Sequence, residues 1–208
     1  MNLDTIRNFD WYNEPEFSFS SGALIIKAQA ETDFWQDKRN NIKKDNGHFF
    51  FSRSSGNFEL IVRWKRPKKI EEICQFGLMG RIDDQNWCKI SVIKIQKEMF
   101  LFLSVTCLGI SDSVIIPIVS DFNIVNYRLY YSKGVFSLSY SLDEQEFMAV
   151  RHFQMHKDFD YIDIGAYICN PNQIVPHPDI NNDMKTKVTV GGSAFFECEL
   201  LDIDINYF

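Results

Sequence analysis

The stretches QFGLMGRID (Gln75–Asp83) and NWCKISVIK (Asn86–Lys94) decide the fold of this chain. Both alternate apolar and other residues, and in a β-strand successive side chains point to opposite faces. One face of the pair is apolar and carries Phe76, Leu78, Gly80 and Ile82 from the first stretch, with Cys88, Ile90 and Val92 from the second. The intervening IDDQN is rich in turn-forming residues. We therefore expect two neighbouring antiparallel strands with their apolar faces turned together into a core.

This register places Arg81, Trp87 and Lys89 together on the opposite, open face. An indole offers a flat apolar platform with one N–H donor, and a guanidinium offers a rigid fork of donors. Sugar rings and planar anions both suit such a surface. The alternative is a Trp covered by a loop, with the two cations extended over it. The sequence alone leaves both interpretations open.

Similar strand patterns recur along the chain with turn signals between them, such as Asn46-Gly47 before His48, a strong hairpin signal. No amphipathic helix is predicted. Many short strands indicate an all-β sandwich or barrel, and we expect residues 1–208 to form one domain. The predicted strands are Ala23–Ala30, His48–Ser52, Asn57–Lys65, Phe76–Ile82, Trp87–Ile95, Met99–Thr106, Ser113–Ile118, Asn126–Ser132, Val135–Ser141, Ile162–Ile168, Lys187–Val190 and Phe195–Ile205.

Two longer polar segments interrupt the strands. Gln36–Asn46 is basic, and Cys169–Asp183 contains three of the six prolines. Because binding residues often lie on loops held by a rigid scaffold, both are candidate rims of a binding cleft. For each segment taken alone, a solvated surface connection is the plainer explanation.

Composition excludes several classes of protein. The 208 residues carry 22 Lys and Arg against 28 Asp and Glu, a net charge of −6, which argues against nucleic-acid and membrane-surface partners. The N-terminal sequence has no signal-peptide pattern, and no apolar run approaches the roughly 18 residues of a membrane helix. Five cysteines without a CxxC pair suit reduced thiols in the cytoplasm. We predict no metal, no cofactor and no nucleotide-binding motif.

Several short segments together resemble one family. The chain is similar to an uncharacterised family of concanavalin-A-like proteins related to a fungal regulator of enolase. The segments that carry the resemblance are Trp11 with Glu14-Pro15, Thr32–Trp35, Asn46–Phe50, Gln75–Asp84, Asn86–Lys89, Ser104–Thr106 and Ser111-Asp112. The resemblance implies a jelly-roll sandwich of two curved antiparallel sheets, and by analogy a carbohydrate-binding concave face, although a fold does not fix a function.

The chain departs from the family pattern at three places. Cys74 and Ile93 stand where the family carries acids, and Ser111–Val114 lacks the family's Trp. The resemblance therefore does not imply shared acid–base chemistry. A retaining glycosidase needs two carboxyls about 5 to 5.5 Å apart. Glu197 with Glu199, and Asp202 with Asp204, share a strand face, but acids that face water on the terminal strand, where they protect a sheet edge, are the plainer explanation.

Further polar residues lie within or near the family-like segments. Asp33 and Asp112 could bind sugar hydroxyls or brace turns. His48 is a candidate ligand contact, and by alternation it shares a face with Phe50, opposite Phe49 and Phe51. Arg151 resembles a family arginine and is expected to reach the concave face. His152 and His156 have zinc-helix spacing, but the segment Val150–Phe153 looks like a strand, in which positions i and i+4 lie about 13 Å apart.

We predict ligand binding by Trp35, His48, Arg81, Trp87, Lys89 and Arg151, with no catalytic residue assigned. Trp35 and Trp87 would stack on a carbohydrate or sugar-derived anion, and the cations would donate hydrogen bonds to it. Two alternatives remain. The face could instead dock another protein, such as a metabolic enzyme, or the chain could be a glycoside hydrolase or lyase.

Overall fold

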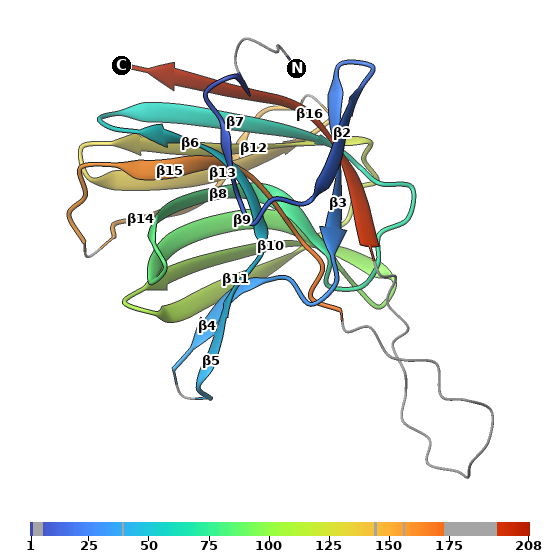
Figure 1. The fold of residues 1–208 in the computed structure, drawn as a ribbon, viewed down its shortest axis with the longest axis horizontal. Helices are drawn as coiled ribbons and strands as arrows, with labels where there is room; N and C mark the ends of the chain where they lie inside the picture. Colours follow the sequence, from blue (N-terminus) through green and yellow to red (C-terminus); the bar gives the residue numbers. More distant parts are fainter. Residues whose placement is uncertain (2–5, 39, 144, 156, 173–194) are drawn as a thin grey trace.

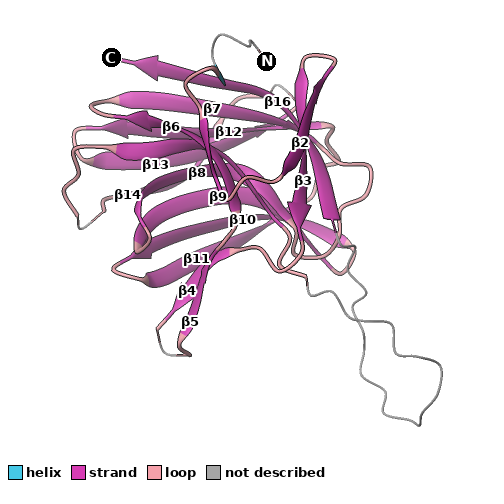
Figure 2. Ribbon diagram, viewed as in Figure 1, coloured by secondary structure: helices cyan, strands magenta, loops and turns pink. Residues whose placement is uncertain are grey.

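The computed structural model describes residues 1, 6–38, 40–143, 145–155, 157–172 and 195–208. Most of them form strands joined by loops, as Figure 2 shows. Two seven-stranded antiparallel sheets form a sandwich, and a separate two-stranded hairpin lies beside it (Figure 1). We call the sheet that contains Gln75–Asp83 the front sheet, the other the back sheet, and the two-stranded unit the cover hairpin.

Both sheets interleave strands from distant parts of the chain. In spatial order the front sheet is β1 (Asp10–Tyr12), β6 (His48–Ser54), β15 (Ile162–Cys169), β8 (Gln75–Asp83), β9 (Asn86–Ile95), β10 (Glu98–Cys107) and β11 (Ile110–Ile118). The back sheet is β14 (Met148–Phe153), β13 (Val135–Leu142), β12 (Ile124–Ser132), β7 (Phe58–Lys65), β16 (Phe195–Tyr207), β3 (Ala23–Gln29) and β2 (Glu16–Ser20). The cover hairpin is β4 (Phe34–Asp37) with β5 (Ile42–Asp45).

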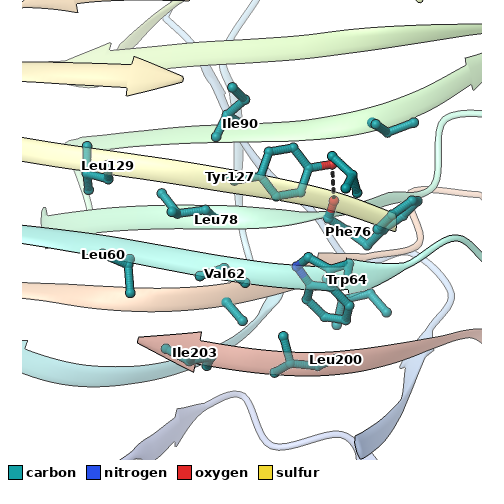
Figure 3. Close-up of a cluster of buried hydrophobic side chains, with 14 of the residues drawn as sticks. Leu60, Val62, Trp64, Phe76, Leu78, Ile90, Tyr127, Leu129, Leu200 and Ile203 are labelled. Carbon is teal, nitrogen blue, oxygen red and sulfur yellow. Dashed lines mark hydrogen bonds between the residues drawn. The ribbon is translucent and has the colours of Figure 1, made fainter. Parts of the chain in front are cut away.

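The main core fills the space between the two sheets. Its members come from alternate positions of facing strands, as Figure 3 shows for Leu60, Val62 and Trp64 of β7 against Phe76 and Leu78 of β8. Two polar groups buried in this core, those of Tyr127 and Trp64, form hydrogen bonds across the sandwich. The Tyr127 hydroxyl donates to the Phe76 carbonyl at 3.1 Å, and the Trp64 indole N–H donates to the Gly77 carbonyl at 3.0 Å. These bonds fix how the two sheets face each other.

Gly77, the glycine in QFGL, is required by a close approach of backbones. A Cβ atom there would lie 1.9 Å from the carbonyl oxygen of Ile90 on β9. The strand can therefore keep this path only without a side chain.

The expected strand framework is confirmed. β8 and β9 pair antiparallel, with Leu78 opposite Ile90 and Gly80 opposite Cys88. The other predicted strands appear within about three residues of their expected ends, apart from Lys187–Val190, which lies outside the described residues. The short strands β1, β2, β4 and β5 were not predicted.

Two sequence-based expectations are wrong around residue 40. Gln36–Asn46 is not a simple polar loop, because it contains most of the cover hairpin. Asn46-Gly47 does not close a hairpin either, since it joins β5 to β6, which pair with different strands. The backbone N–H groups of Asn46 and Gly47 both donate to the Asp33 carbonyl. A Cβ at Gly47 would collide with Phe34 and with the Cys169 sulfur, which explains the glycine.

No helix in the described part of the chain is long and apolar enough to cross a membrane.

Candidate functional site

The predicted face lies on the outer side of the front sheet. Strand register places Arg81 of β8 opposite Trp87 of β9, and Met79 opposite Lys89. Across the next pairing, Trp87 lies opposite Thr106 and Lys89 opposite Ser104. The expectation that Arg81, Trp87 and Lys89 share one face is therefore confirmed.

The expectation that this face is open is wrong. Trp87 and Lys89 are 0% exposed and Arg81 is 8% exposed. The cover hairpin lies over them, and Phe34 of β4 fills the centre with its ring against the rings of Tyr12, Trp87 and Tyr167. Phe34, Phe49, Met79, Trp87, Tyr167 and Cys169 form a second buried apolar cluster. Of the two interpretations left open by the sequence, the covered Trp describes this half of the face.

The Lys89 ammonium is fully engaged within the protein. Its three donors meet the Phe34 carbonyl at 2.6 Å, Gln75 Oε1 at 2.9 Å and Asp33 Oδ1 at 3.3 Å. The rings of Trp87, Phe102 and Tyr167 lie 5.4 to 5.5 Å from the same nitrogen, so cation–π attraction adds to the hydrogen bonds. The buried charge is thus paired and solvated by the chain itself.

Arg81 is held in the same way. Its guanidinium forms a bidentate pair with Asp45 of β5, at 2.7 and 3.0 Å, and lies 4.8 Å above the Tyr12 ring. The Tyr12 hydroxyl donates to Asp45 as well. Burial, followed by the nearby Asp45 charge, raises the pKa of Tyr12. Two carboxylates of the segment that covers the face, Asp33 and Asp45, therefore occupy the two cations that the sequence assigned to a ligand.

Further bonds attach the cover hairpin to the edge of the sheet. The backbone N–H of Gln36 donates to Ser111 Oγ of β11 at 3.1 Å, and the side-chain amide of Gln36 donates to the Asp84 backbone carbonyl. Lys43 pairs with the Asp84 carboxylate at 2.6 Å. With this many long-range contacts the hairpin is an integral part of the fold.

His48 and Arg151 lie away from this face. His48 has the predicted alternation, since Phe50 joins the main core whereas Phe49 joins the second cluster. Its Nδ1 lies 2.6 Å from the Asn13 carbonyl, and its Nε2 accepts the Gln29 N–H at 3.3 Å. Burial lowers the pKa of His48. The imidazole is thus a neutral brace between three segments.

Arg151 stands on β14, an edge strand of the back sheet. It pairs with Asp112 of β11 at 2.8 Å. The expectation that it reaches the concave face is therefore wrong, because it joins the edges of the two sheets. His152 lies beside it in β14, and His156 lies outside the described residues.

Trp35 borders the open half of the face. Cross-strand partners share a face, so Trp35 and Lys44 lie on the face of the hairpin opposite to Phe34 and Asp45. Trp35 is half-buried and its ring lies 6.5 Å from the Phe102 ring of β10. A hollow of about 250 Å³ between the cover hairpin and β11 is lined by Trp35, Gln36, Asp37, Lys38, Ile110 and Ser111. Three of these come from the segment predicted as a cleft rim.

Three buried donors on the same outer face lack a hydrogen-bond partner among the described residues. They are Trp87 Nε1, Ser91 Oγ and Ser104 Oγ. A row of side chains across the strands connects Trp87 to Ser111, because Trp87 lies opposite Thr106 and Thr106 lies opposite Ser111. The hydroxyls of Thr106 and Ser111 are 2.7 Å apart. Polar groups therefore extend from the hollow toward the covered half.

A larger hollow lies elsewhere. It measures about 440 Å³ and lies where β7 and β16 meet the basic segment Arg63–Lys69. Lys65 pairs with Glu199, Arg66 with Asp121, and Lys69 with Glu71. Cations already paired in this way leave little charge for an anionic partner, so size alone does not make this hollow the site.

The arrangement of acids does not resemble a glycosidase centre. Asp33, Asp45, Asp83 and Asp163 pair with Lys89, Arg81, Lys157 and Arg53 respectively. Each of these carboxylates is already engaged by a cation of the chain, whereas a retaining glycosidase needs two carboxyls free to act on the glycosidic bond. Glu197, Glu199, Asp202 and Asp204 lie on β16 of the back sheet. That strand runs between β7 and β3, so the expectation that its acids protect a sheet edge is wrong.

Candidate metal ligands do not gather in the described part of the chain, and two of its thiols are deeply buried. It holds no group of three or more His, Cys, Asp or Glu that could bind a metal ion. Burial raises the pKa of the Cys74 and Cys88 thiols to about 12, so neither is a thiolate nucleophile at neutral pH.

Residues 11–190 match the family described as Protein of unknown function (DUF1349). The chain belongs to this family. It is also 27% identical over 164 residues to Regulation of enolase protein 1 of Saccharomyces cerevisiae, which covers 78% of this chain and 81% of the yeast protein. The resemblance drawn from the short sequence segments is therefore confirmed.

Solved structures share the fold. A functionally unknown protein from Saccharomyces cerevisiae superposes with a TM-score of 0.78 at 20% identity, over 97% of both chains. The exoplasmic/lumenal domain of VIP36, in its Ca²⁺/Man3GlcNAc-bound form, gives 0.58 at 7% identity over 98% of this chain and 85% of that one. Bacteroides ovatus Xyloglucan PUL GH43B gives 0.63 at 11% identity, over 97% of this chain and 37% of that one. The expected concanavalin-A-like sandwich is confirmed.

Proposed function

We propose that this protein binds a neutral carbohydrate in the hollow between the cover hairpin and β11, with Trp35 as the stacking platform. The observation that carries the proposal is the position of Trp35. It is a half-buried indole that borders a hollow with polar walls, whereas Trp64 and Trp87 are sealed inside the protein.

The lining of the hollow suits a sugar ring. The indole and Ile110 offer apolar surface to the C–H face of a sugar, while Asp37, Lys38 and Ser111 offer acceptors and donors to hydroxyls. A volume of about 250 Å³ falls just below the usual range for ligand pockets, which favours one or two sugar rings over a long chain. The covered half of the face adds rigidity, because Arg81 and Lys89 hold the hairpin on which Trp35 stands.

The comparisons support the proposal only through the fold. VIP36 is described in a sugar-bound form, and its sandwich is similar to this one. Since fold similarity does not transfer a site, the proposal depends on the hollow itself. We further propose that residues 1–208 act as one domain in the cytoplasm, which the shared core of the two sheets and the five free cysteines support.

Calorimetric titration with neutral mono- and disaccharides of glucose, mannose and xylose tests the proposal. Trp35→Ala should weaken binding about tenfold or more, because it removes the platform. Ile42→Ala is the matched control, since Ile42 is an exposed apolar residue of the same hairpin that does not line the hollow. Equal binding by wild type and W35A, or no binding of any sugar by the folded wild type, would contradict the proposal.

A second candidate function is docking of a metabolic enzyme. Strand β11 and the turns beside it expose the apolar residues Leu108, Ile110, Val114, Ile115 and Val119. Exposed apolar groups that cluster at a sheet edge are typical of protein contacts. The name of the yeast relative makes enolase the enzyme to test. If purified enolase binds wild type but not Ile115→Asp, and no sugar binds, docking is the better assignment.

A further inference from the structure

A second hollow lies at the other side of the front sheet. It measures about 330 Å³ and is lined by Arg53 of β6, Ile82 of β8, Asp163 of β15 and the segment Lys157–Tyr161 that leads into β15. None of these residues was assigned to a ligand from the sequence. The hollow lies outside the area that the cover hairpin seals.

The walls of this hollow are fixed from several directions. Arg53 forms a bidentate pair with Asp163, at 2.8 and 3.2 Å, and Lys157 pairs with Asp83 at the end of β8. Phe159 packs its ring against Tyr131 and Phe136 at the edge of the main core. The segment that carries Tyr161 is thus anchored at both Lys157 and Phe159.

Tyr161 is 60% exposed, which is unusual for a large aromatic side chain on a segment held this firmly. Asp158 and Asp160, on either side of Phe159, also line the hollow. The ring therefore offers an apolar face, and the carboxylates offer acceptors to hydroxyl groups. The Arg53–Asp163 pair presents donors and acceptors side by side.

The charge of the lining decides between classes of ligand. Two cations, Arg53 and Lys157, stand against three carboxylates, Asp158, Asp160 and Asp163. Both cations are already paired. An anionic sugar such as a sugar phosphate would meet excess negative charge, whereas a neutral sugar with adjacent hydroxyls matches the alternating donors and acceptors.

The two hollows stand at opposite ends of one row of side chains. Register aligns Arg53, Asp163, Arg81, Trp87, Thr106 and Ser111 across β6, β15, β8, β9, β10 and β11. Five strand spacings separate Arg53 from Ser111, which is about 24 Å. The covered half, with the cover hairpin above it, lies between them. A small sugar cannot bridge this distance, so the hollows act independently.

We propose that the Tyr161 hollow is a second site for a neutral saccharide and that the protein is therefore bivalent. This inference rests on the proposed function in its ligand class, but a separate set of residues carries it. Two sites on one rigid face would strengthen attachment to a polysaccharide through effective concentration, without any further contact.

The test is calorimetric stoichiometry with the same neutral disaccharides, on wild type, Trp35→Ala, Tyr161→Ala and Tyr207→Ala. Tyr207 is the matched control, since it is 58% exposed and lies on the back sheet. We expect two sites in wild type and in Y207A, and one site in each of W35A and Y161A. Retention on an immobilised polysaccharide of the same sugar should fall more than tenfold when either site is lost.

The possible results separate the two proposals. One site in wild type that W35A removes and Y161A leaves intact overturns the second site and keeps the first. One site that Y161A removes and W35A leaves intact keeps the second site and overturns the first. No binding by folded wild type overturns both.

Discussion

Phe34 and Trp35 are neighbours in the chain, yet they belong to opposite halves of the front face. Phe34 is sealed among Tyr12, Trp87 and Tyr167, while Trp35 borders the hollow beside β11. The covered half contains the residues that the sequence assigned to a ligand, whereas the open half contains a hollow that a ligand could enter. A Trp next to two cations is therefore not sufficient evidence of a site, because the chain can supply its own carboxylates to such a surface.

The variant Phe34→Ala gives the strongest test of the difference between the covered and the open half. Removing a fully buried ring that closes the second cluster should lower the free energy of unfolding by about 4 kcal/mol. Urea denaturation followed by tryptophan fluorescence measures the change. A loss below about 1 kcal/mol would mean that the cover hairpin is not part of the stable fold.

Arg81→Met tests the ion pair that holds β5. The variant keeps much of the side-chain volume but leaves Asp45 without its cation, and breaking a largely buried pair should cost about 3 kcal/mol. The double variant R81M with Asp45→Asn should recover part of this loss in the same denaturation experiment. No recovery would show that Arg81 acts through packing on Tyr12 instead.

His48 lies outside both halves of the front face, and we expect it to make the stability of the protein depend on pH. Burial lowers its pKa, so the unfolded state binds the proton more readily than the folded state. The contribution of His48 is fully present above about pH 6.5 and is lost as the pH falls through the folded pKa. His48→Gln should flatten the dependence of the unfolding free energy below pH 6.5. An unchanged slope in H48Q would assign the acid sensitivity to other groups.

Trp35→Ala should have the smallest effect on stability. The ring is half-buried and its centroid lies 6.5 Å from that of Phe102, so we expect a loss of about 1 kcal/mol in the unfolding free energy. The comparison predicts that this variant loses sugar binding while it stays folded, and that Phe34→Ala loses stability first. A loss in W35A as large as that in F34A would make both residues core residues.

Much of this architecture could be predicted from alternation alone. Apolar residues such as Leu78 and Ile90 lie in one environment, the core between the two sheets. The alternation of apolar and other residues therefore identifies their strands, their pairing and the face on which they lie. The alternation also placed Arg81, Trp87 and Lys89 together. Their shared direction follows from local geometry, which a short sequence window contains.

The cover over that face could not be predicted in the same way. The cover hairpin is stabilised by one buried ring, Phe34, and by single long-range bonds, such as Asp45 to Arg81 and Gln36 to Ser111, rather than by an apolar stripe. Polar residues on both strands look like a solvated loop in the sequence. Asp33 and Asp45 gave no signal that they were the partners of the two cations, because that pairing exists only after the front sheet has formed.

Because the Lys89 ammonium is fully buried, its chemical reactivity can report the opening of the cover hairpin. An amine-reactive reagent labels surface lysines at once, but it can reach Lys89 only in molecules whose cover hairpin has lifted away from the sheet. The labelling rate of Lys89 Nζ, followed by peptide mass spectrometry, therefore reports how often the hairpin opens. A ligand that holds the hairpin against the sheet would lower this labelling rate.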